Sequence, residues 1–219
     1  MVGEIKQISY NEAKDFLLPR HYSGRTPSIS WAFGWYIKNK LVAVCSFGKP
    51  ASNSLCKGVC GIEFSPKVFE LNRLCRIESL NHPLSSFVSA CLRSLKEHNL
   101  IIISYSDTRM NHTGYIYQAC SFIYTGKTKR RTDKYTEGNK HCRHYDNDKQ
   151  NGLRKVRSAK HRYIFFAMRD KKLKKLALGE LRYPIMPYPK GENKNYMLGD
   201  FLLPEIVKTG DLSEAKRTQ

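Results

Sequence analysis

The 219-residue sequence predicts a single α/β domain built on one mixed sheet. Three observations support this fold class. Several short segments alternate apolar and polar residues as strands do, one segment has the apolar period of a helix, and the strand after that helix is apolar almost throughout. A helix that crosses over into a buried strand is typical of parallel pairing, so we expect parallel strands near this crossover.

The chain begins with a short strand, expected over residues 4–8. Ser9 and Glu12 then fit a capping box, which predicts that a helix starts there. This helix is expected to end before Pro19, because the residue that precedes a proline disfavours helical geometry. A polar loop follows over residues 20–27.

A hairpin is predicted next. Residues 30–37 alternate, residues 38–40 are suited to a tight turn, and residues 41–47 form a second, more buried strand. Residues 48–66 are rich in Gly, Ser and Pro and are predicted to be a long loop. A strand interrupted by polar residues is expected over 68–77.

The second half of the domain alternates helices and strands. Apolar residues after Pro83 recur at helical spacing and predict an amphipathic helix that ends near Asn99. A buried strand is expected over residues 100–105, with a polar exit at residues 104–107. The remaining expected elements are a short helix over 112–120, a strand over 122–125 and a final strand over 163–168.

Positive charge is concentrated in one segment. Of the formal net charge of +19, residues 127–175 hold 18 Lys and Arg against 5 Asp and Glu, whereas residues 176–219 balance at 6 against 6. Such a block favours a polyanionic partner, most often nucleic acid, over a merely solvated basic face. We therefore expect a domain over residues 1–175 with a basic insertion at 127–175, and a partly extended C-terminal arm over 176–219.

The cysteines and the apolar runs bear on the compartment. Most of the seven cysteines lie in apolar segments, which indicates reduced core thiols and not a disulfide framework. The sequence shows no signal-peptide pattern and no apolar run long enough to span a membrane. A cytoplasmic protein without a membrane partner is the expectation, and a homodimer is compatible with it.

Two polar segments are candidates for chemistry. Ser104 and Asp107 follow a buried strand at a sheet edge, where Asp107 is suited to act as a base or to orient a histidine; capping of the next turn is the alternative. His21 and Tyr22 lie in a loop and offer a group that titrates near neutral pH and a phenol that can stack on a base. An ordinary surface histidine is the alternative there. His112 lies shortly after Asp107 and either joins the site or only starts a helix.

Three polar residues of the strand over 68–77 are candidate cofactor ligands. Asn72, Arg73 and Arg76 are suited to hold phosphate groups, since guanidinium groups bind them in bidentate fashion. Pairing of the arginines with Glu70 and Glu78 is equally compatible with the sequence.

A fragment of a metal site occurs at His141, Cys142 and His144. It lacks a second pair of ligands at the spacing of a zinc site, so a solvated loop that contacts phosphate is favoured over structural zinc. No Walker loop, dinucleotide-binding glycine pattern or kinase signature is present.

The predicted DNA contacts come mainly from the basic block, where tyrosines interleave with the cations. Cations neutralise phosphates and release counterions, and aromatic rings stack on unpaired bases. The residues predicted to contact DNA are Arg25, Lys127, Lys129, Arg130, Arg131, Arg154, Lys155, Arg157, Lys160 and Arg162.

Six short segments, taken together and in this order, resemble the Mom family of bacteriophage DNA-modification proteins, which are divergent members of the GNAT acyltransferase superfamily. The resemblance covers roughly residues 5–190. It implies a GNAT-like fold, with which the mixed sheet derived above is compatible. The segments are Arg20–Ser23, Leu71–Leu74, Ser104–Asp107, Gly114–Ala119, Phe122–Gly126 and Lys160–Tyr163.

The resemblance implies modification of the exocyclic N6 amine of adenine in double-stranded phage DNA, to a carbamoylmethyl-type group that protects the DNA from host restriction. An enzyme that acts on this weakly nucleophilic amine must extrude the base and orient an activated donor. Under this hypothesis the catalytic residues are His21, Tyr22, Ser104 and Asp107, with His or Asp as the base. Tyr115 and Tyr117 are expected to wall the base pocket, although their helical spacing favours a core position for at least one of them.

The donor is less defined. An ordinary GNAT enzyme holds coenzyme A with a glycine-rich turn, and the corresponding residues 76–83 contain no glycine. This departure favours another acyl- or glycyl-type donor, or a metal-assisted reaction for which His21, Asp107 and His112 are the candidate ligands.

Other functions fit parts of the sequence. A conventional acetyltransferase that acts on a protein or a small amine would bind coenzyme A. A non-catalytic DNA-binding protein would need only the basic block. A metal-dependent nuclease would be built around His141 and His144.

Overall fold

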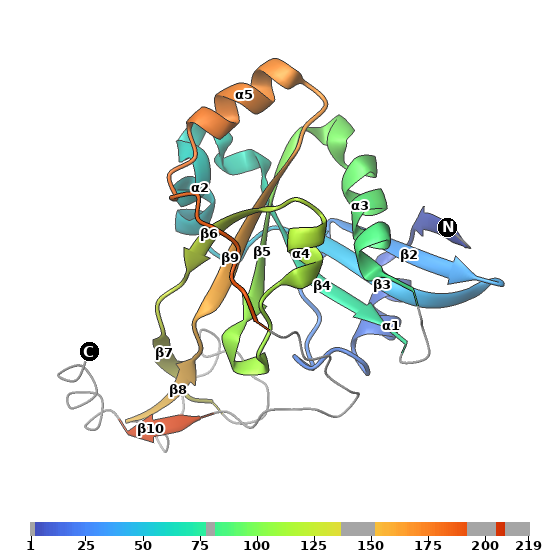
Figure 1. The fold of residues 1–219 in the computed structure, drawn as a ribbon. Coiled ribbons are helices and arrows are strands. Elements are labelled where there is room, and N and C mark those ends of the chain that lie inside the picture. The colour runs from blue at the N-terminus through green and yellow to red at the C-terminus, as the bar shows by residue number, and fades with distance from the viewer. Residues whose placement is uncertain (1–2, 78–81, 137–151, 192–204, 209–219) are drawn as a thin grey trace.

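A seven-stranded mixed sheet forms the centre of the protein, with its strands in the order β1-β2-β3-β4-β5-β9-β6 (Figure 1). The computed structural model describes residues 3–77, 82–136, 152–191 and 205–208. Neighbouring strands of this sheet are antiparallel, except for β4 and β5, which are parallel. The predicted mixed α/β sheet is therefore confirmed. The strands are β1 Glu4–Gln7, β2 Trp31–Ile37, β3 Lys40–Gly48, β4 Val68–Arg76, β5 Leu100–Asp107, β9 Lys160–Ala167 and β6 Ile123–Lys127.

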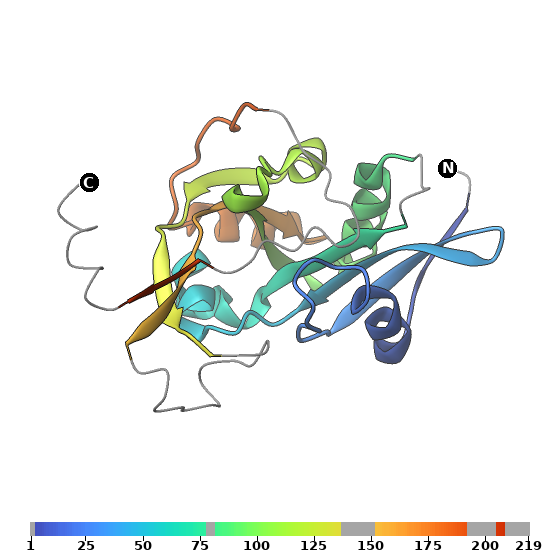
Figure 2. The same ribbon diagram turned by 90° about the horizontal axis from the view of Figure 1, so that it is seen from below.

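Helices cover both faces of the sheet. Figure 2 shows α1 and α2 on one side and α3 and α4 on the other. Residues of α2 and α5 share a core cluster with Ile101 and Ile103 of β5, whereas Phe87 of α3 packs in the cluster that contains Ile102. Alternation along the strand thus assigns successive side chains to opposite faces. The helices are α1 Tyr10–Leu17, α2 Asn53–Phe64, α3 Leu84–Ser94, α4 Tyr115–Ala119 and α5 Lys171–Gly179, with 3₁₀ turns at Ser65–Lys67, Lys96–His98 and Thr108–Met110.

The predicted hairpin is confirmed as β2 and β3, which pair antiparallel. Lys38 and Asn39 at its turn have φ angles of 48° and 60°. Positive φ at both central residues is the geometry whose twist matches the flanking strands.

The two parallel strands part after a short contact. β4 and β5 pair only over Val68–Glu70 and Ile101–Ile103. Beyond this point β4 continues along β3, and β5 continues along β9. We call the divergence of β4 and β5 the fork. At its base the Ser104 hydroxyl donates to the Leu71 carbonyl oxygen at 2.9 Å.

A bulge in β4 changes which side chains face the fork. Phe47 pairs with Leu71 and Ser46 pairs with Arg73, so Asn72 is one extra residue in β4. Because successive strand residues alternate faces, residues three apart normally lie on opposite faces. The extra residue shifts the alternation of side chains by one position, so Glu70 and Arg73 lie on the same face of the sheet. This is the face that α1 and α2 cover.

The long loop predicted over residues 48–66 is wrong, because α2 occupies most of it. The Ser52 hydroxyl caps α2 by accepting from the Leu55 N–H at 3.2 Å. Cys56 and Val59 are buried against the sheet, and this burial overrides the weak helix propensity of the Gly- and Ser-rich segment. The helix bends at Gly61, where φ is 87°.

A second sheet, with its strands in the order β10-β8-β7, has no counterpart in the sequence prediction. Five of the nine residues of β7 and β8 are Lys or Arg. These cations hide the alternation of apolar and polar residues by which a strand is recognised in a sequence. The strands are β7 Arg131–Lys134, β8 Leu153–Arg157 and β10 Ile206–Lys208.

Two predicted boundaries near the end of the domain also differ. β9 starts at Lys160 instead of residue 163, and it is not the final strand. α5 extends across residue 175, where an extended arm was expected to begin. The Asp170 carboxylate caps α5, and Ala177 is buried against the core, so its four lysines belong to an amphipathic helix.

An extended segment over residues 180–191 packs back on the domain. The Met186 N–H donates to the Tyr124 carbonyl oxygen at 2.9 Å, and the Tyr188 hydroxyl donates to the Phe122 carbonyl oxygen at 2.8 Å. This segment is part of the range predicted to be the C-terminal arm. His141, Cys142 and His144 lie outside the described residues, as do residues 78–81 of the turn without glycine. Among the helices of the described ranges, none is long and apolar enough to cross a membrane.

Candidate active site

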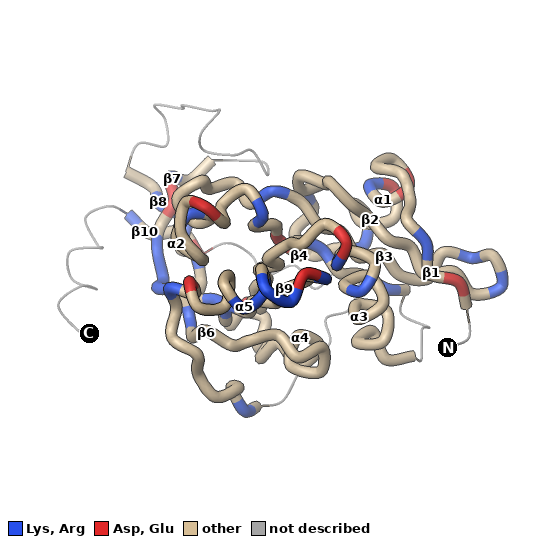
Figure 3. The backbone as a smooth tube through the Cα atoms, turned by 90° about the horizontal axis from the view of Figure 1, so that it is seen from above, with Lys and Arg blue, Asp and Glu red and all other residues tan. Residues whose placement is uncertain are grey.

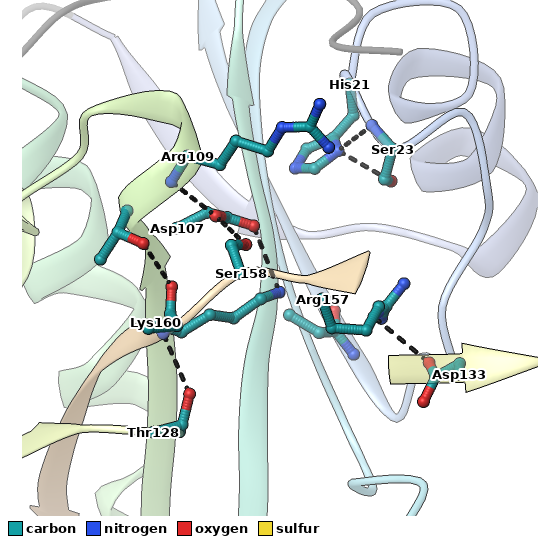
Figure 4. Close-up of polar contacts among 12 residues, drawn as sticks. His21, Ser23, Asp107, Arg109, Thr128, Asp133, Arg157, Ser158 and Lys160 are labelled. Carbon is teal, nitrogen blue, oxygen red and sulfur yellow. Dashed lines mark hydrogen bonds and ion pairs between the residues drawn. The ribbon is translucent and has the colours of Figure 1, made fainter. Parts of the chain in front are cut away.

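Five titratable side chains gather at the fork, and we call them the fork cluster: His21, Glu70, Arg73, Asp107 and Lys160. They come from the loop after α1, from β4, from the end of β5 and from the start of β9. The charges of Arg73 and Lys160 act on both His21 and Glu70, and that of Asp107 acts on Lys160. Figure 4 shows His21, Asp107 and Lys160 approaching one another from three of these elements.

The loop of His21 is built by short-range bonds. The His21 N–H donates to the Leu17 carbonyl oxygen at 2.8 Å and continues the last turn of α1. The Gly24 N–H donates to the His21 carbonyl oxygen at 2.9 Å and turns the chain back. The imidazole is buried and stacks on the Tyr22 ring at 4.4 Å between centroids. The charge of Asp107 at the end of β5 acts on Tyr22 of this loop.

The bulge in β4 ties this loop to the sheet. The Asn72 amide donates to the Ser28 carbonyl oxygen at 2.7 Å and accepts from the Ser46 hydroxyl at 2.8 Å. Arg73 donates to the Arg25 carbonyl oxygen at 3.2 Å. The loop comes so close that a Cβ on Gly48 would lie 1.8 Å from the Ser28 carbonyl oxygen.

These contacts change the interpretation of the predicted cofactor ligands. The Asn72 amide is committed to Ser28 and Ser46, so it positions the loop and is not directed at a cofactor. Arg73 joins the fork cluster, where its charge acts on His21 and Glu70. Arg76 lies at the far end of β4, three residues beyond Arg73 and opposite Ala43 of β3.

Burial dominates the electrostatics of His21. The pKa of the imidazole is lowered from 6.5 to about 3, mainly by burial and in addition by the positive charges of Arg73 and Lys160. His21 is consequently neutral at physiological pH. Burial also raises the pKa of the Tyr22 phenol, and Asp107 adds to this rise.

Asp107 is held by three partners. Its carboxylate accepts from the Arg109 N–H at 3.0 Å and from the Ser158 hydroxyl at 2.5 Å, and it lies 3.7 Å from Lys160 Nζ. The capping alternative for Asp107 is thereby realised, because the Arg109 N–H belongs to the following 3₁₀ turn. Figure 4 shows the same carboxylate between Ser158, Lys160 and the backbone of Arg109.

Glu70 and Lys160 are the site residues that sequence reasoning missed. Burial raises the pKa of the Glu70 carboxyl, and Lys160 and Arg73 oppose this rise. Burial lowers the pKa of the Lys160 ammonium, whereas Asp107 and Glu70 stabilise its charge. The sequence places Glu70 as an ion-pair partner and Lys160 as a DNA contact. The signal available for Glu70 was a carboxylate within a predicted strand.

The predicted hydroxyl and base-pocket residues occupy other environments. Ser104 is fully buried at the base of the fork. Tyr117 packs against Phe122 and Tyr163 in the core, as its helical spacing allows. Tyr115 is 64% exposed on the opposite face of α4. A base pocket walled by both tyrosines is therefore not formed in this structure.

Four cations lie near one another beside the fork cluster, and we call them the cationic rim: Arg25, Arg109, Lys155 and Arg157. Burial lowers the pKa of Lys155, and the charges of Arg157, Arg25 and Arg109 lower it further. They come from the His21 loop, the turn after β5, and β8. Asp133 of β7 offsets this charge and lies 3.4 Å from Arg157. Figure 4 shows Arg157 and Asp133 beside the fork cluster.

Some of the other predicted DNA contacts are exposed, and others donate hydrogen bonds to groups within the protein. Lys127, Lys129, Arg130 and Arg131 are exposed, and Arg130 pairs with Glu205 at 3.2 Å. Arg154 donates to Thr132 of β7. Arg162 donates to the hydroxyl and the carbonyl of Thr125 and lies 3.4 Å above the Tyr183 ring centre, which gives it a structural role.

The candidate metal ligands are not assembled. Within the part of the chain that the structure describes, no three His, Cys, Asp or Glu side chains are arranged as a metal site requires. His21, Asp107 and His112 therefore do not form the three-ligand set that the sequence suggested.

Comparisons with known proteins provide the remaining findings. The model of the Mom protein family matches residues 3–190. Among solved structures, the chain is similar to an acetyltransferase from Bacillus subtilis in complex with CoA, at 17% identity, 75% coverage of this chain and 97% of the other, and a TM-score of 0.42. It is also similar to an N-acetyltransferase from Staphylococcus aureus, at 11% identity, 76% and 99% coverage, and a TM-score of 0.47. A ribosomal-protein-S5-alanine acetyltransferase from Vibrio fischeri matches at 12% identity, 76% and 94% coverage, and a TM-score of 0.46. These likenesses are too distant to indicate a reaction, and no curated protein matches the chain.

Proposed function

The chain belongs to the Mom protein family, and from this premise we propose that it is a transferase that modifies the exocyclic N6 amine of adenine in phage DNA. The group transferred is of the carbamoylmethyl type, and the modification protects the DNA from host restriction. The observation that supports this function best is a partly buried set of acids and cations at the fork, with the cationic rim beside it.

The amine chemistry requires a base. The lone pair of an adenine N6 amine is delocalised into the ring, so a proton has to leave the nitrogen as the new bond forms. Asp107 is already engaged by a backbone N–H, a hydroxyl and an ammonium group. Glu70 is the better proton acceptor, because burial raises the pKa of its carboxyl toward neutrality.

Lys160 balances the charge of the two carboxylates. Its ammonium group is stabilised by Asp107 and Glu70, and it lies within the fork cluster. In this role it keeps Glu70 ionised in the resting site and favours the carboxylate form that accepts a proton. Asp107 is a positioning residue, since it acts through Lys160.

The cationic rim fits a DNA backbone. Duplex DNA carries one negative charge per about 1.7 Å of axis, and cations that neutralise phosphates supply much of the binding free energy. The target base has to leave the stack to reach the fork, and phosphates on either side of it would then lie at the rim. The exposed cations of β7 and of the segment before it extend this surface.

The donor is defined only by its chemistry, as an activated acyl- or glycyl-type group. In the proposed step N6 attacks the activated carbon, the bond from that carbon to its carrier breaks with the electron pair leaving on the carrier, and the N6 proton passes to Glu70. We place this step beside Glu70, where β4 and β5 part. No part of the proposal depends on coenzyme A or on a metal ion.

One experiment tests the function directly. The protein is expressed in bacteria, the co-purified plasmid is digested to nucleosides, and adenosines of increased mass are measured by mass spectrometry. We expect a modified adenosine with the wild-type protein and its loss with Glu70→Gln, which keeps the shape and removes the base. The control is Lys174→Ala on α5, an exposed cation far from the fork, which should leave the yield unchanged. Unmodified adenine with well-expressed wild-type protein would refute the function.

A further inference from the structure

His21 is held in one hydrogen-bonded form by its own loop. The Ser23 backbone N–H donates to His21 Nδ1 at 3.1 Å, and the Ser23 hydroxyl oxygen lies 2.9 Å from the same nitrogen. A ring nitrogen that accepts from a backbone N–H carries no hydrogen of its own, so a neutral imidazole has its hydrogen on Nε2. Figure 4 shows both contacts on one nitrogen, with the other nitrogen on the opposite side of the ring from Ser23.

The surroundings oppose protonation of this ring. A second hydrogen would have to sit on Nδ1, where it would face the Ser23 N–H. The positive charges of Arg73 and Lys160 both disfavour a charged imidazole, and Asp107 acts on the neighbouring Tyr22. The side chain is only 7% exposed, so water does little to screen these charges. His21 can therefore donate a hydrogen bond but cannot take up a proton at neutral pH.

We propose that His21 recognises the target base, by donating from Nε2–H to a ring nitrogen of adenine that flanks the N6 amine, and that it is not the base of the reaction. The inference rests on the proposed function. It assigns proton removal to Glu70 and orientation of the nucleobase to His21, whereas the sequence left the base of the reaction open between His21 and Asp107.

The position of the loop supports a nucleobase as the acceptor. His21 and Arg25 lie in the same loop, and Arg25 belongs to the cationic rim, so the imidazole is on the side where the DNA strand would pass. Adenine presents acceptors at N1 and N7, one on each side of the N6 amine. A donor fixed against either one would hold the amine toward Glu70.

The fixed hydrogen also supplies selectivity among bases. Guanine carries a hydrogen on N1, so it would set a donor against a donor on that edge. A site built to pair with one acceptor strongly rejects a base that lacks it, because a buried group is then left unpaired. The same bond draws electron density from the ring and makes the amine hydrogens easier to remove.

Nuclear magnetic resonance of the uniformly ¹⁵N-labelled wild-type protein tests the resting state without reference to activity. Two-bond ¹H–¹⁵N correlations distinguish Nε2–H, Nδ1–H and imidazolium forms of each histidine, and His21→Gln assigns the signals. We expect His21 to remain neutral with Nε2–H between pH 5 and pH 8. A hydrogen on Nδ1, or an imidazolium near pH 7, would overturn this inference whatever the protein modifies.

Base analogues test the contact itself. Oligonucleotides carry adenine, 7-deazaadenine or 1-deazaadenine at the target position, and kcat/KM for modification is measured with the wild type, His21→Gln and His21→Ala. We expect His21→Ala to lose about 10- to 100-fold on adenine, as for one buried hydrogen bond, and His21→Gln to lose less because its amide donates from a similar position.

On the analogue that lacks the contacted nitrogen, the wild type and His21→Ala should become equal. An equal loss from His21→Ala on all three bases would refute the contact. Lys174→Ala on α5, an exposed cation, is the control and should behave like the wild type on all three bases. If the wild type modifies no adenine while the spectra show Nε2–H, the proposed function fails and the adenine contact fails with it.

Discussion

Lys160 Nζ lies 3.7 Å from Asp107 Oδ2, and this contact joins the first residue of β9 to the last residue of β5. The Lys160 side chain is 35% exposed, so the ion pair itself adds little to stability. Its importance lies in fixing an ammonium group next to Glu70, in a site whose other cations would repel it.

Replacement of Asp107 by Asn should separate this role from folding. The variant keeps the shape but loses the charge that sustains the pKa of Lys160 against burial and against Arg157. We expect the free energy of unfolding to change by less than about 1 kcal/mol, and the rate of adenine modification to fall by about 10- to 100-fold. Urea unfolding and nucleoside mass spectrometry measure the two effects. An unchanged rate would exclude a positioning role for Asp107.

Replacement of Asn72 by Ala should destabilise the loop of His21. The amide group makes two hydrogen bonds, to Ser28 and Ser46, and each contributes about 1 kcal/mol. We expect the free energy of unfolding to fall by about 1–2 kcal/mol, with a lower urea midpoint. Ser46→Ala is the matched control, because it removes only one of the bonds and should cost about half as much. Equal stability of Asn72→Ala and the wild type would show that the two hydrogen bonds of the Asn72 amide do not contribute to the free energy of unfolding.

The low pKa of His21 predicts acid sensitivity. The folded protein holds this imidazole with a pKa of about 3, whereas the unfolded chain has the ordinary value of 6.5. Between these values the unfolded state binds one more proton, so stability falls as the pH decreases, by up to about 1.4 kcal/mol per pH unit. His21→Gln lacks this proton. Its stability relative to the wild type should therefore be higher at pH 4.5 than at pH 7, as measured by urea unfolding. A difference independent of pH would contradict the assignment.

Arg162 should matter for stability and not for DNA. Its guanidinium group bonds to Thr125 and covers the Tyr183 ring, so it fastens the segment after α5 to the sheet. We expect Arg162→Ala to cost about 1–3 kcal/mol in urea unfolding. The salt dependence of DNA binding should stay as in the wild type. A lower salt slope would return Arg162 to the predicted DNA contacts.

The rim and α5 provide a comparison of two basic surfaces. Figure 1 places α5 and the small sheet at opposite ends of the molecule, and Figure 3 marks the Lys and Arg positions of both. Lys155→Ala with Arg157→Ala should lower the slope of log affinity against log salt by about 2 in fluorescence anisotropy with a DNA duplex. Lys174→Ala with Lys175→Ala removes the same charge from α5 and should leave the slope unchanged. An equal decrease of the slope in both double variants would indicate that DNA is attracted by the net charge of the protein and not by the cationic rim.

Much of the fold was accessible from the sequence because its patterns are local. The hairpin has its turn residues, α3 has its apolar period, and the first half of β5 is a continuous apolar run. The segment of α2 was predicted to be a loop because its glycines and serines are typical of loops. Its helix depends on burial of Cys56 and Val59 against distant strands. β7 and β8 were missed because cations fill positions that usually alternate.

The candidate site was only partly accessible, since it depends on pairing between distant segments. His21 and Asp107 were identified from their loops, and the fold brings them to one place. Glu70 was not, because a carboxylate within a strand is usually solvated, and only the fold brings it near Arg73 and Lys160. The phase change at Asn72 depends on register, which sequence patterns do not specify.

The bulge at Asn72 has a consequence for how related chains are compared. Because one extra residue sets the phase, Glu70 and Arg73 share a face at a spacing of three. A relative with a regular strand would need its acid and its arginine two or four positions apart to reach the same arrangement. An alignment that matches residue types column by column would then count such a relative as lacking the arginine. The number of residues between the two charges and the presence of a bulge therefore have to be considered together when a related chain is examined for this arrangement.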